Sequence, residues 1–176
     1  VNMLASIRNR WQRWRFNADC HPILDTAPLR LDASSAFGVL SQVQHKDVRM
    51  YLLAVKSFCR YLKPANITVV NDGSLKPADL AVLNAHLPGV SIRDIHEFTS
   101  AHCPRGGTWE RLLAIASLVP TQYTIQLDCD TLTLAMPQEI IDHIQTQTSF
   151  VIGTCPAQSI EPMAIQRARA QEKVTG

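Results

Sequence analysis

Hydrophobic residues from Ala36 onward alternate between short runs of strand length and longer stretches with helical spacing. The short apolar runs are bounded by turn residues and predict buried strands at residues 36–43, 67–70, 91–95, 124–127 and 150–154. The helical spacing, with Asp47 as an N-cap and Pro64 as a stop, predicts helices at residues 47–62, 77–86, 109–119 and 137–145. Strands that alternate with helices are typical of βαβ units. The pattern therefore predicts an α/β fold with a Rossmann-like, mainly parallel sheet flanked by helices.

The first part of the chain has a different pattern, so we expect an N-terminal basic aromatic helical segment at 1–33 and the α/β domain at 34–176. Residues 4–16 set arginines among large aromatic residues: Arg8, Arg10, Arg13 and Arg15 beside Trp11, Trp14 and Phe16. Two interpretations stay open. Such a helix can make peripheral contact with an anionic membrane surface, or it can pack its tryptophans on the domain or on a partner.

The composition indicates a globular protein and excludes broad classes of partner. With 176 residues, of which 46% are hydrophobic and 18% charged, the chain is long enough for one domain with a sizeable core. A net charge of +2 and 6% aromatic residues argue against nucleic acid as a partner.

No window of continuous apolar residues is long enough to span a membrane, and there is no signal-peptide pattern. We therefore expect a cytoplasmic protein, peripheral at the membrane if residues 4–16 bind there. The five cysteines form no CxxC pair, and we interpret them as reduced thiols.

Two acidic turns follow predicted strands. In TIQLDCDTL the apolar run ends in Asp128 and Asp130, and the two-residue period of a strand predicts that both carboxylates project the same way. Like charges repel, and the usual neutralisers are Arg, Lys or a divalent cation. The turn Asn71-Asp72-Gly73-Ser74 follows the predicted strand at 67–70. Because open α/β sheets bind ligands beyond the carboxyl ends of their strands, we expect a ligand site at these turns.

These residues carry a resemblance to a known family. The stretch AVKSFCRYLKPANITVVNDGSL, followed further along by WERLLAIASLVPTQYTIQLDCDTL, resembles nucleotide-sugar glycosyltransferases of the GT-A fold, which carry a D-x-D motif. The likeness runs from about Ala36 to Thr154. It implies a metal-dependent glycosyltransferase that moves a sugar from a nucleotide-diphosphate donor, with a UDP-sugar favoured, to an unknown acceptor.

The resemblance also implies roles for four residues. Asp72 matches the aspartate that reads the base, and Arg111 matches a basic residue that meets the nucleotide. Asp130 matches the direct ligand of Mn²⁺ or Mg²⁺, and Asp128 would face the ribose or reach the metal through water. The ion would neutralise the charge that grows on the diphosphate leaving group. The catalytic residue is unknown, because this family usually supplies it after the D-x-D portion; we expect a partial chain, truncated at the C-terminus, that holds the donor-binding half.

Each of these residues also has a plain structural interpretation. Asp72 can brace its own turn by accepting from the backbone N–H groups of Gly73 and Ser74. Arg111 can be an exposed helix residue paired with Glu110 or with nothing. The aspartates at 128 and 130 can be solvated acids that cap the next turn.

Three alternative functions stay open beside the glycosyltransferase. A phosphatase of the haloacid dehalogenase type also uses D-x-D, but on its first strand and with Thr or Val where this chain has Leu132. A sugar-phosphate nucleotidyltransferase usually has a glycine-rich basic loop after the first strand, which SQVQHKDV lacks. The third is a catalytically silent GT-A-like binding domain.

Overall fold

A computed structural model of the protein describes residues 3–106 and 108–151. The chain divides into two compact units, Val1–Thr146 and Gln147–Gly176, and all of the helices and strands named below belong to the first. The elements in chain order are α1 (Met3–Asp19), η1 (His21–Asp25), β1 (Phe37–Val43), η2 (His45–Asp47), α2 (Val48–Cys59), β2 (Ile67–Asn71), α3 (Pro77–His86), β3 (Ser91–Asp94), η3 (Ile95–Glu97), α4 (Trp109–Leu118), β4 (Tyr123–Gln126) and α5 (Gln138–Thr146).

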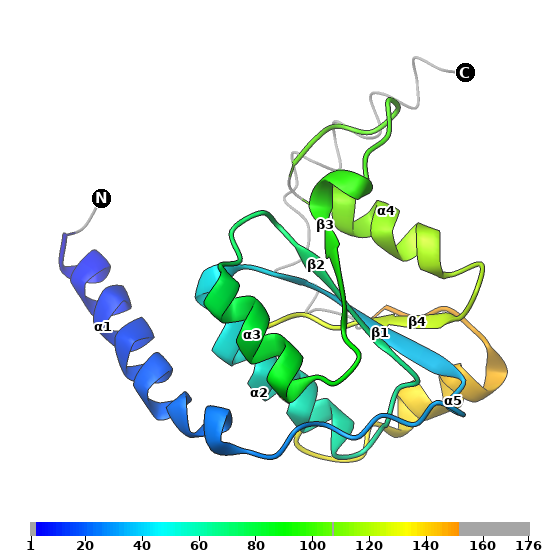
Figure 1. The fold of residues 1–176 in the computed structure, drawn as a ribbon, viewed down its shortest axis with the longest axis horizontal. Helices are drawn as coiled ribbons and strands as arrows, with labels where there is room; N and C mark the ends of the chain where they lie inside the picture. The colour runs from blue at the N-terminus through cyan, green and yellow to red at the C-terminus, as the bar shows by residue number, and fades with distance from the viewer. Residues whose placement is uncertain (1–2, 107, 152–176) are drawn as a thin grey trace. The chain divides into compact units, whose positions relative to one another are not determined.

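The four strands form one parallel sheet in the order β3-β2-β1-β4, flanked by helices (Figure 1). Val39 of β1 is in register with Ile67 of β2 on one side and with Ile125 of β4 on the other. The prediction of an α/β fold with a parallel sheet is therefore confirmed. The strand predicted at 150–154 is not confirmed: Phe150 and Val151 lie in no strand, and residues 152–154 lie outside the described residues.

Both faces of the sheet are buried at its central strands, β1 and β2, which explains why these two strands are nearly continuous apolar runs. Val39 and Val43 of β1 belong to the larger core cluster, which includes buried residues of α2 and α3 such as Leu52 and Leu83. Leu40 points the other way and packs in a second cluster with Ala114 of α4. The alternation along β1 therefore seats α2 and α3 on one face of the sheet and α4 on the other.

The helix starts agree with the sequence in position and differ in one cap. Pro77 opens α3, and the Asp79 carboxylate accepts a hydrogen bond from the Lys76 backbone N–H at 2.8 Å, which satisfies a donor at the helix start. Asp47 does occupy the N-cap position of α2, but its side chain makes no capping hydrogen bond. The expectation of a capping carboxylate at Asp47 was wrong, and this side chain faces a pocket described below.

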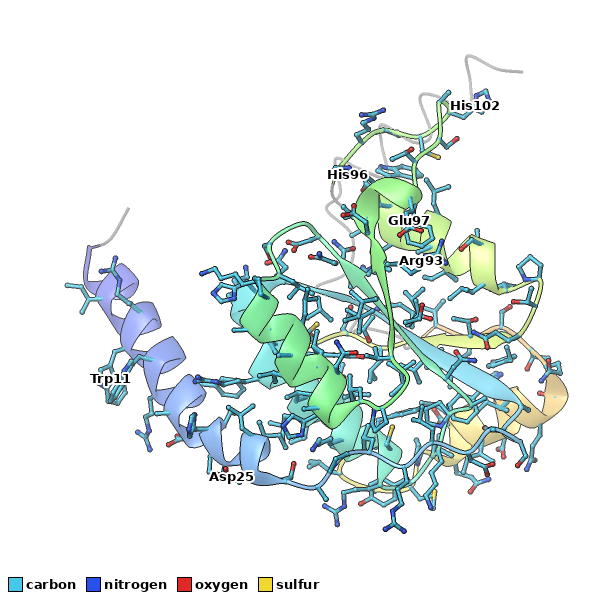
Figure 2. The ribbon with its side chains drawn as sticks, in the orientation of Figure 1. Trp11, Asp25, Arg93, His96, Glu97 and His102 are labelled. Carbon is cyan, nitrogen blue, oxygen red and sulfur yellow. The ribbon has the colours of Figure 1, made fainter. Side chains whose placement is uncertain are left out.

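Arg93 at the end of β3 pairs with Glu97, with Nη2 and Oε2 2.6 Å apart (Figure 2). Among the described residues, no helix is long and apolar enough to cross a membrane. The described cysteines are all free, as expected for reduced thiols: Cys20, Cys59, Cys103 and Cys129. Cys155 lies outside the described part of the chain.

Candidate functional site

The candidate site lies where the strand order reverses. From β1 the chain proceeds to β2 and β3 on one side of the sheet, whereas β4 pairs with β1 on the other side. The carboxyl ends of β1 and β4 therefore flank the crevice in which doubly wound sheets bind their ligands. A pocket of about 240 Å³ lies at this point, and its lining includes Asp47, Arg111, Asp128 and Asp130. We call it the switch-point pocket.

The structure pairs Asp128 with an arginine of α4. Arg111 Nη1 donates to Asp128 Oδ1 at 2.7 Å, and Gln126 Nε2 donates to the same oxygen at 2.9 Å. Arg111 is therefore not paired with Glu110. The buried Glu110 carboxylate instead accepts from the Gly106 N–H at 2.6 Å. This hydrogen bond, and a second one from the backbone N–H of Glu110 itself, lower the pKa of Glu110. The positive partner that the aspartates require is thus Arg111, at least for Asp128.

The D-x-D segment lies just beyond β4 rather than within it. The strand ends at Gln126, so Asp128 and Asp130 lie in a loop and turn. The prediction that both carboxylates project from one face of a strand was therefore wrong, because the strand does not extend to them. Their burial still alternates: both aspartates are exposed, while Cys129 between them is half-buried and packs against the larger core cluster. This alternation presents two acids to solvent around one anchored residue.

Cys129 anchors the turn and is not a reactive thiolate. Its Sγ donates to the Gln42 carbonyl of β1 at 3.2 Å. Burial, and then the nearby charges of Asp47, Asp128 and Asp130, raise the pKa of the Cys129 thiol to about 12. The thiol is therefore protonated at neutral pH and is not a nucleophile. Its role is to hold the D-x-D turn against the end of β1.

Asp72 lies at the end of the neighbouring strand, β2, and braces its own turn. Its Oδ1 accepts from the Ser74 N–H at 3.0 Å and from Ser74 Oγ at 2.6 Å. The Gly73 N–H bonds instead to Asn71 Oδ1 at 2.9 Å, so the expected bond from Gly73 to Asp72 was wrong. Asp72 is not among the described residues that line the switch-point pocket. The structure therefore brings Arg111, Asp128 and Asp130 together and leaves Asp72 beside them.

The turn at Asp72 is tied to the loop that leaves β1. Ser74 Oγ accepts from the His45 backbone N–H at 2.8 Å, and His45 Nδ1 lies 2.6 Å from Asp79 Oδ2. These bonds hold the β1–α2 and β2–α3 loops together at the carboxyl edge of the sheet. A larger cavity of about 390 Å³ adjoins His45 and Asp79 between α2 and α3. Because that imidazole and carboxylate are engaged with each other, and the D-x-D turn lines the smaller pocket, the switch-point pocket is the better candidate.

Asp128 and Asp130 are the residues of the switch-point pocket that could hold a divalent metal. Within residues 3–106 and 108–151, no group of three or more His, Cys, Asp or Glu side chains is placed to hold an ion. The two exposed carboxylates at 128 and 130 are nevertheless enough for Mg²⁺, which is usually bound by one or two carboxylates with phosphate oxygens and water. The pocket thus suits an ion that arrives with a phosphorylated ligand.

Sequence reasoning missed three polar residues at this edge. Gln42 and Gln126 lie at the carboxyl ends of β1 and β4, and Asp47 follows β1 in η2. Gln126 bonds to Asp128, and Gln42 and Asp47 line the pocket. The available signal was a glutamine near the end of each of two strands that become neighbours, but their adjacency depends on the strand order, which the sequence pattern does not state.

Comparison of the chain with family models, with curated proteins and with solved structures found no match. The interpretation of the site therefore depends on its geometry and on the sequence motifs.

Proposed function

We propose that the protein is a metal-dependent glycosyltransferase of the GT-A type that binds a nucleotide-diphosphate sugar, with a UDP-sugar favoured, at the carboxyl edge of β1 and β4. One observation carries the proposal. The pocket at the strand-order reversal combines two exposed carboxylates, Asp128 and Asp130, with the guanidinium of Arg111. Acids for a cation and an arginine for phosphate, in one pocket, suit a metal-bound diphosphate.

The residues of the pocket have complementary roles in this proposal. Asp130 and Asp128 would hold Mn²⁺ or Mg²⁺, which supplies neutralisation of the diphosphate leaving group. Arg111 holds Asp128 in place before the ligand binds, and its planar guanidinium presents further N–H donors suited to phosphate oxygens. Asp72, at the end of β2, would accept from the imide N–H of uracil while its turn is held by Ser74. The β1–β4 edge thus addresses the diphosphate and the β2 edge the base.

Two observations make the rival enzymes less suitable. The D-x-D turn follows the fourth strand in chain order, at the edge of the described sheet, whereas the haloacid dehalogenase motif ends the first strand. The loop between β1 and α2, Gln44–Asp47, forms a short 3₁₀ turn without the glycines that nucleotidyltransferases use around phosphates. A silent binding domain remains a distinct outcome of the experiments below.

The test is calorimetric titration of the chain with UDP in the presence of Mn²⁺, Mg²⁺ or EDTA. We expect tighter binding with either ion than with EDTA, and loss of this difference in Asp130→Ala. The matched control is Asp25→Ala, which removes an exposed aspartate of η1 far along the chain from the D-x-D turn. Metal-dependent UDP binding that survives in Asp130→Ala would contradict the proposed metal site.

Three further assays separate the candidate reactions. Hydrolysis of p-nitrophenyl phosphate with Mg²⁺, or trapping of Asp128 by beryllofluoride, would indicate the phosphatase. Release of pyrophosphate from UTP and a sugar 1-phosphate would indicate the nucleotidyltransferase. We expect neither activity. Metal-dependent UDP binding without any transfer or hydrolysis of UDP-sugars would indicate the silent binding domain.

A further inference from the structure

Helix α1 has a stripe of large apolar side chains along one side. Ile7, Trp11 and Trp14 are spaced by four and three residues, which places them on the same side of a helix with 3.6 residues per turn. They are 60%, 55% and 67% exposed, respectively. The Trp11 ring projects outward from the helix in Figure 2. Isolated exposed apolar residues are ordinary, but three in register form a contiguous apolar surface that needs an explanation.

Arginines border this stripe on both sides. At 100° per residue, Arg8 and Arg15 lie next to the stripe on one side, and Arg10 lies next to it on the other. The Arg15 guanidinium is 5.6 Å from the centre of the Trp11 ring and 3.7 Å from Asp19 Oδ2. Asp19, at the last position, is the single acidic residue in the helix sequence. The border of the apolar stripe is therefore positively charged along most of its length.

We propose that α1 lies on the surface of an anionic membrane, with Ile7, Trp11 and Trp14 inserted among the lipid chains and the bordering arginines on the lipid phosphates. This inference goes beyond the proposed transferase function and does not depend on it. Tryptophan is suited to the membrane–water interface because its ring is apolar and its N–H is polar. Arginine can extend its apolar stem along the stripe while its charge stays at the headgroups.

Charge and geometry favour lipid over a protein partner. A helix that lies in the headgroup plane meets phosphate along both edges of its buried stripe, which is where Arg8, Arg15 and Arg10 are placed. An apolar stripe of this size combined with basic residues also supplies the two contributions, hydrophobic and electrostatic, that stable peripheral binding requires.

The experiment is co-sedimentation of the full chain with phosphatidylcholine vesicles, prepared with or without phosphatidylglycerol. We expect binding to the anionic vesicles that weakens as salt is added, and weak binding to the neutral ones. The double variant Trp11→Ala/Trp14→Ala should lose binding. Each Arg→Gln change at positions 8, 10 and 15 should weaken the partition coefficient about fivefold, since a basic residue near an anionic surface contributes about 1 kcal/mol. Arg→Lys at the same positions keeps the charge and should retain binding.

The matched control is Phe16→Ala, because Phe16 is an exposed aromatic residue on the side of the helix opposite to Trp11 and Trp14. This variant should bind vesicles as the wild type does. Tryptophan emission in a Trp109→Phe background should shift to shorter wavelength on binding, since the remaining tryptophans are Trp11 and Trp14. Asp130→Ala should bind vesicles normally, which separates this inference from the transferase proposal.

Three results would overturn the proposal. The first is absence of binding to anionic vesicles by a wild-type chain that circular dichroism shows to be folded. The second is binding that neither the tryptophan nor the arginine variants change. The third is a dimer or a larger complex, seen by light scattering without lipid, that Trp11→Ala/Trp14→Ala dissociates, because the stripe would then be covered by protein.

Discussion

Arg111 Nη1 lies 2.7 Å from Asp128 Oδ1, so one ion pair joins helix α4 to the turn that follows β4. The pair answers the electrostatic problem of the D-x-D segment, because it places a positive charge against one of two exposed carboxylates. It also means that the side chains proposed to meet the phosphate and the metal touch each other before any ligand arrives. When a phosphorylated ligand and its cation bind, the Arg111–Asp128 pair would be replaced by two pairs: Arg111 with the phosphate, and Asp128 with the cation.

The first prediction concerns Arg111. Arg111→Gln should weaken binding of UDP with Mg²⁺ about 10- to 100-fold, because a hydrogen bond to a charged group contributes roughly 1.5–3 kcal/mol. The melting temperature should change little, since exposed ion pairs contribute only about 0–1 kcal/mol. Calorimetry and thermal unfolding measure the two quantities. The matched control is Arg93→Gln, which breaks the Arg93–Glu97 pair at the end of β3 and should leave UDP affinity unchanged. If Arg111→Gln binds UDP as tightly as Arg93→Gln does, Arg111 is excluded from the ligand site.

The second prediction separates the two roles of Asp72. An asparagine at this position can still accept from the Ser74 N–H and Oγ, so Asp72→Asn should keep the melting temperature while Asp72→Ala should lower it. If the carboxylate reads the base, both variants should lose preference for UDP over ADP, by up to about 1.5–3 kcal/mol of charge-assisted bonding. The measurement is the ratio of the two affinities beside the melting temperature.

Ser74→Ala is the control for this second experiment, because it removes the Oγ bonds to Asp72 and from the His45 N–H and leaves the carboxylate of Asp72 in place. A preference for UDP that stays intact in both Asp72 variants would assign Asp72 to the turn alone.

The fold was predictable from the sequence because its helices and strands depend on local pattern. Pro77 starts α3 where expected, and the apolar run before Asp72 forms β2 with both faces covered. The strand order was not predictable, because a parallel sheet of βαβ units does not state which strand is the neighbour of β1. The site depends on that order, since Gln42 of β1 meets Cys129 after β4 only because the two strands pair.

The details of the site followed from tertiary contacts that no local pattern contains. Asp47 has the sequence of an N-cap, yet its side chain makes no capping bond and faces the switch-point pocket. Arg111 follows Glu110 in sequence, but side chains of consecutive helix residues point about 100° apart. Glu110 is buried against the Gly106 N–H, whereas Arg111 reaches Asp128 beyond β4, a partner 17 residues away that no local pattern indicates.

The third prediction concerns stability at mildly acidic pH. Burial, followed by the nearby Lys56 ammonium 2.9 Å from Nδ1, lowers the pKa of His86 in the folded protein. Well above the ordinary histidine pKa of about 6.5, the imidazole is neutral in both states. As the pH falls below that value, the unfolded chain takes up a proton that the folded chain resists, so the free energy of unfolding decreases down to the folded pKa. Urea unfolding at several pH values should show this decrease.

The matched variants for His86 isolate the effect from other titrating groups. His86→Gln should flatten the pH dependence of the free energy of unfolding between the unfolded and the folded pKa of His86. His102→Gln, at an exposed position, should leave this dependence as in the wild type. Lys56→Met removes the neighbouring cation and should raise the pKa of His86 in the folded protein. The pH range over which stability falls should therefore become narrower. An unchanged slope in His86→Gln would show that other groups produce the acid sensitivity.

The last prediction concerns Gly38, a buried residue in β1 over which two amide side chains meet. Asn66 Nδ2 donates to Gln122 Oε1 at 2.7 Å, and Gln122 Nε2 donates to Asn66 Oδ1 at 3.2 Å. A Cβ at position 38 would lie 2.5 Å from Asn66 Oδ1 and 2.6 Å from Gln122 Nε2. Gly38→Ala should therefore separate the two amides and lower the free energy of unfolding by about 1–3 kcal/mol. Denaturant unfolding measures the loss. Gln122→Ala removes one of the two clashing amides and releases Asn66 from its partner, so that Asn66 can turn away from the methyl group. The double variant should therefore be more stable than the sum of the single changes predicts. Strict additivity of the two changes would show that the methyl group is accommodated without displacing Gln122.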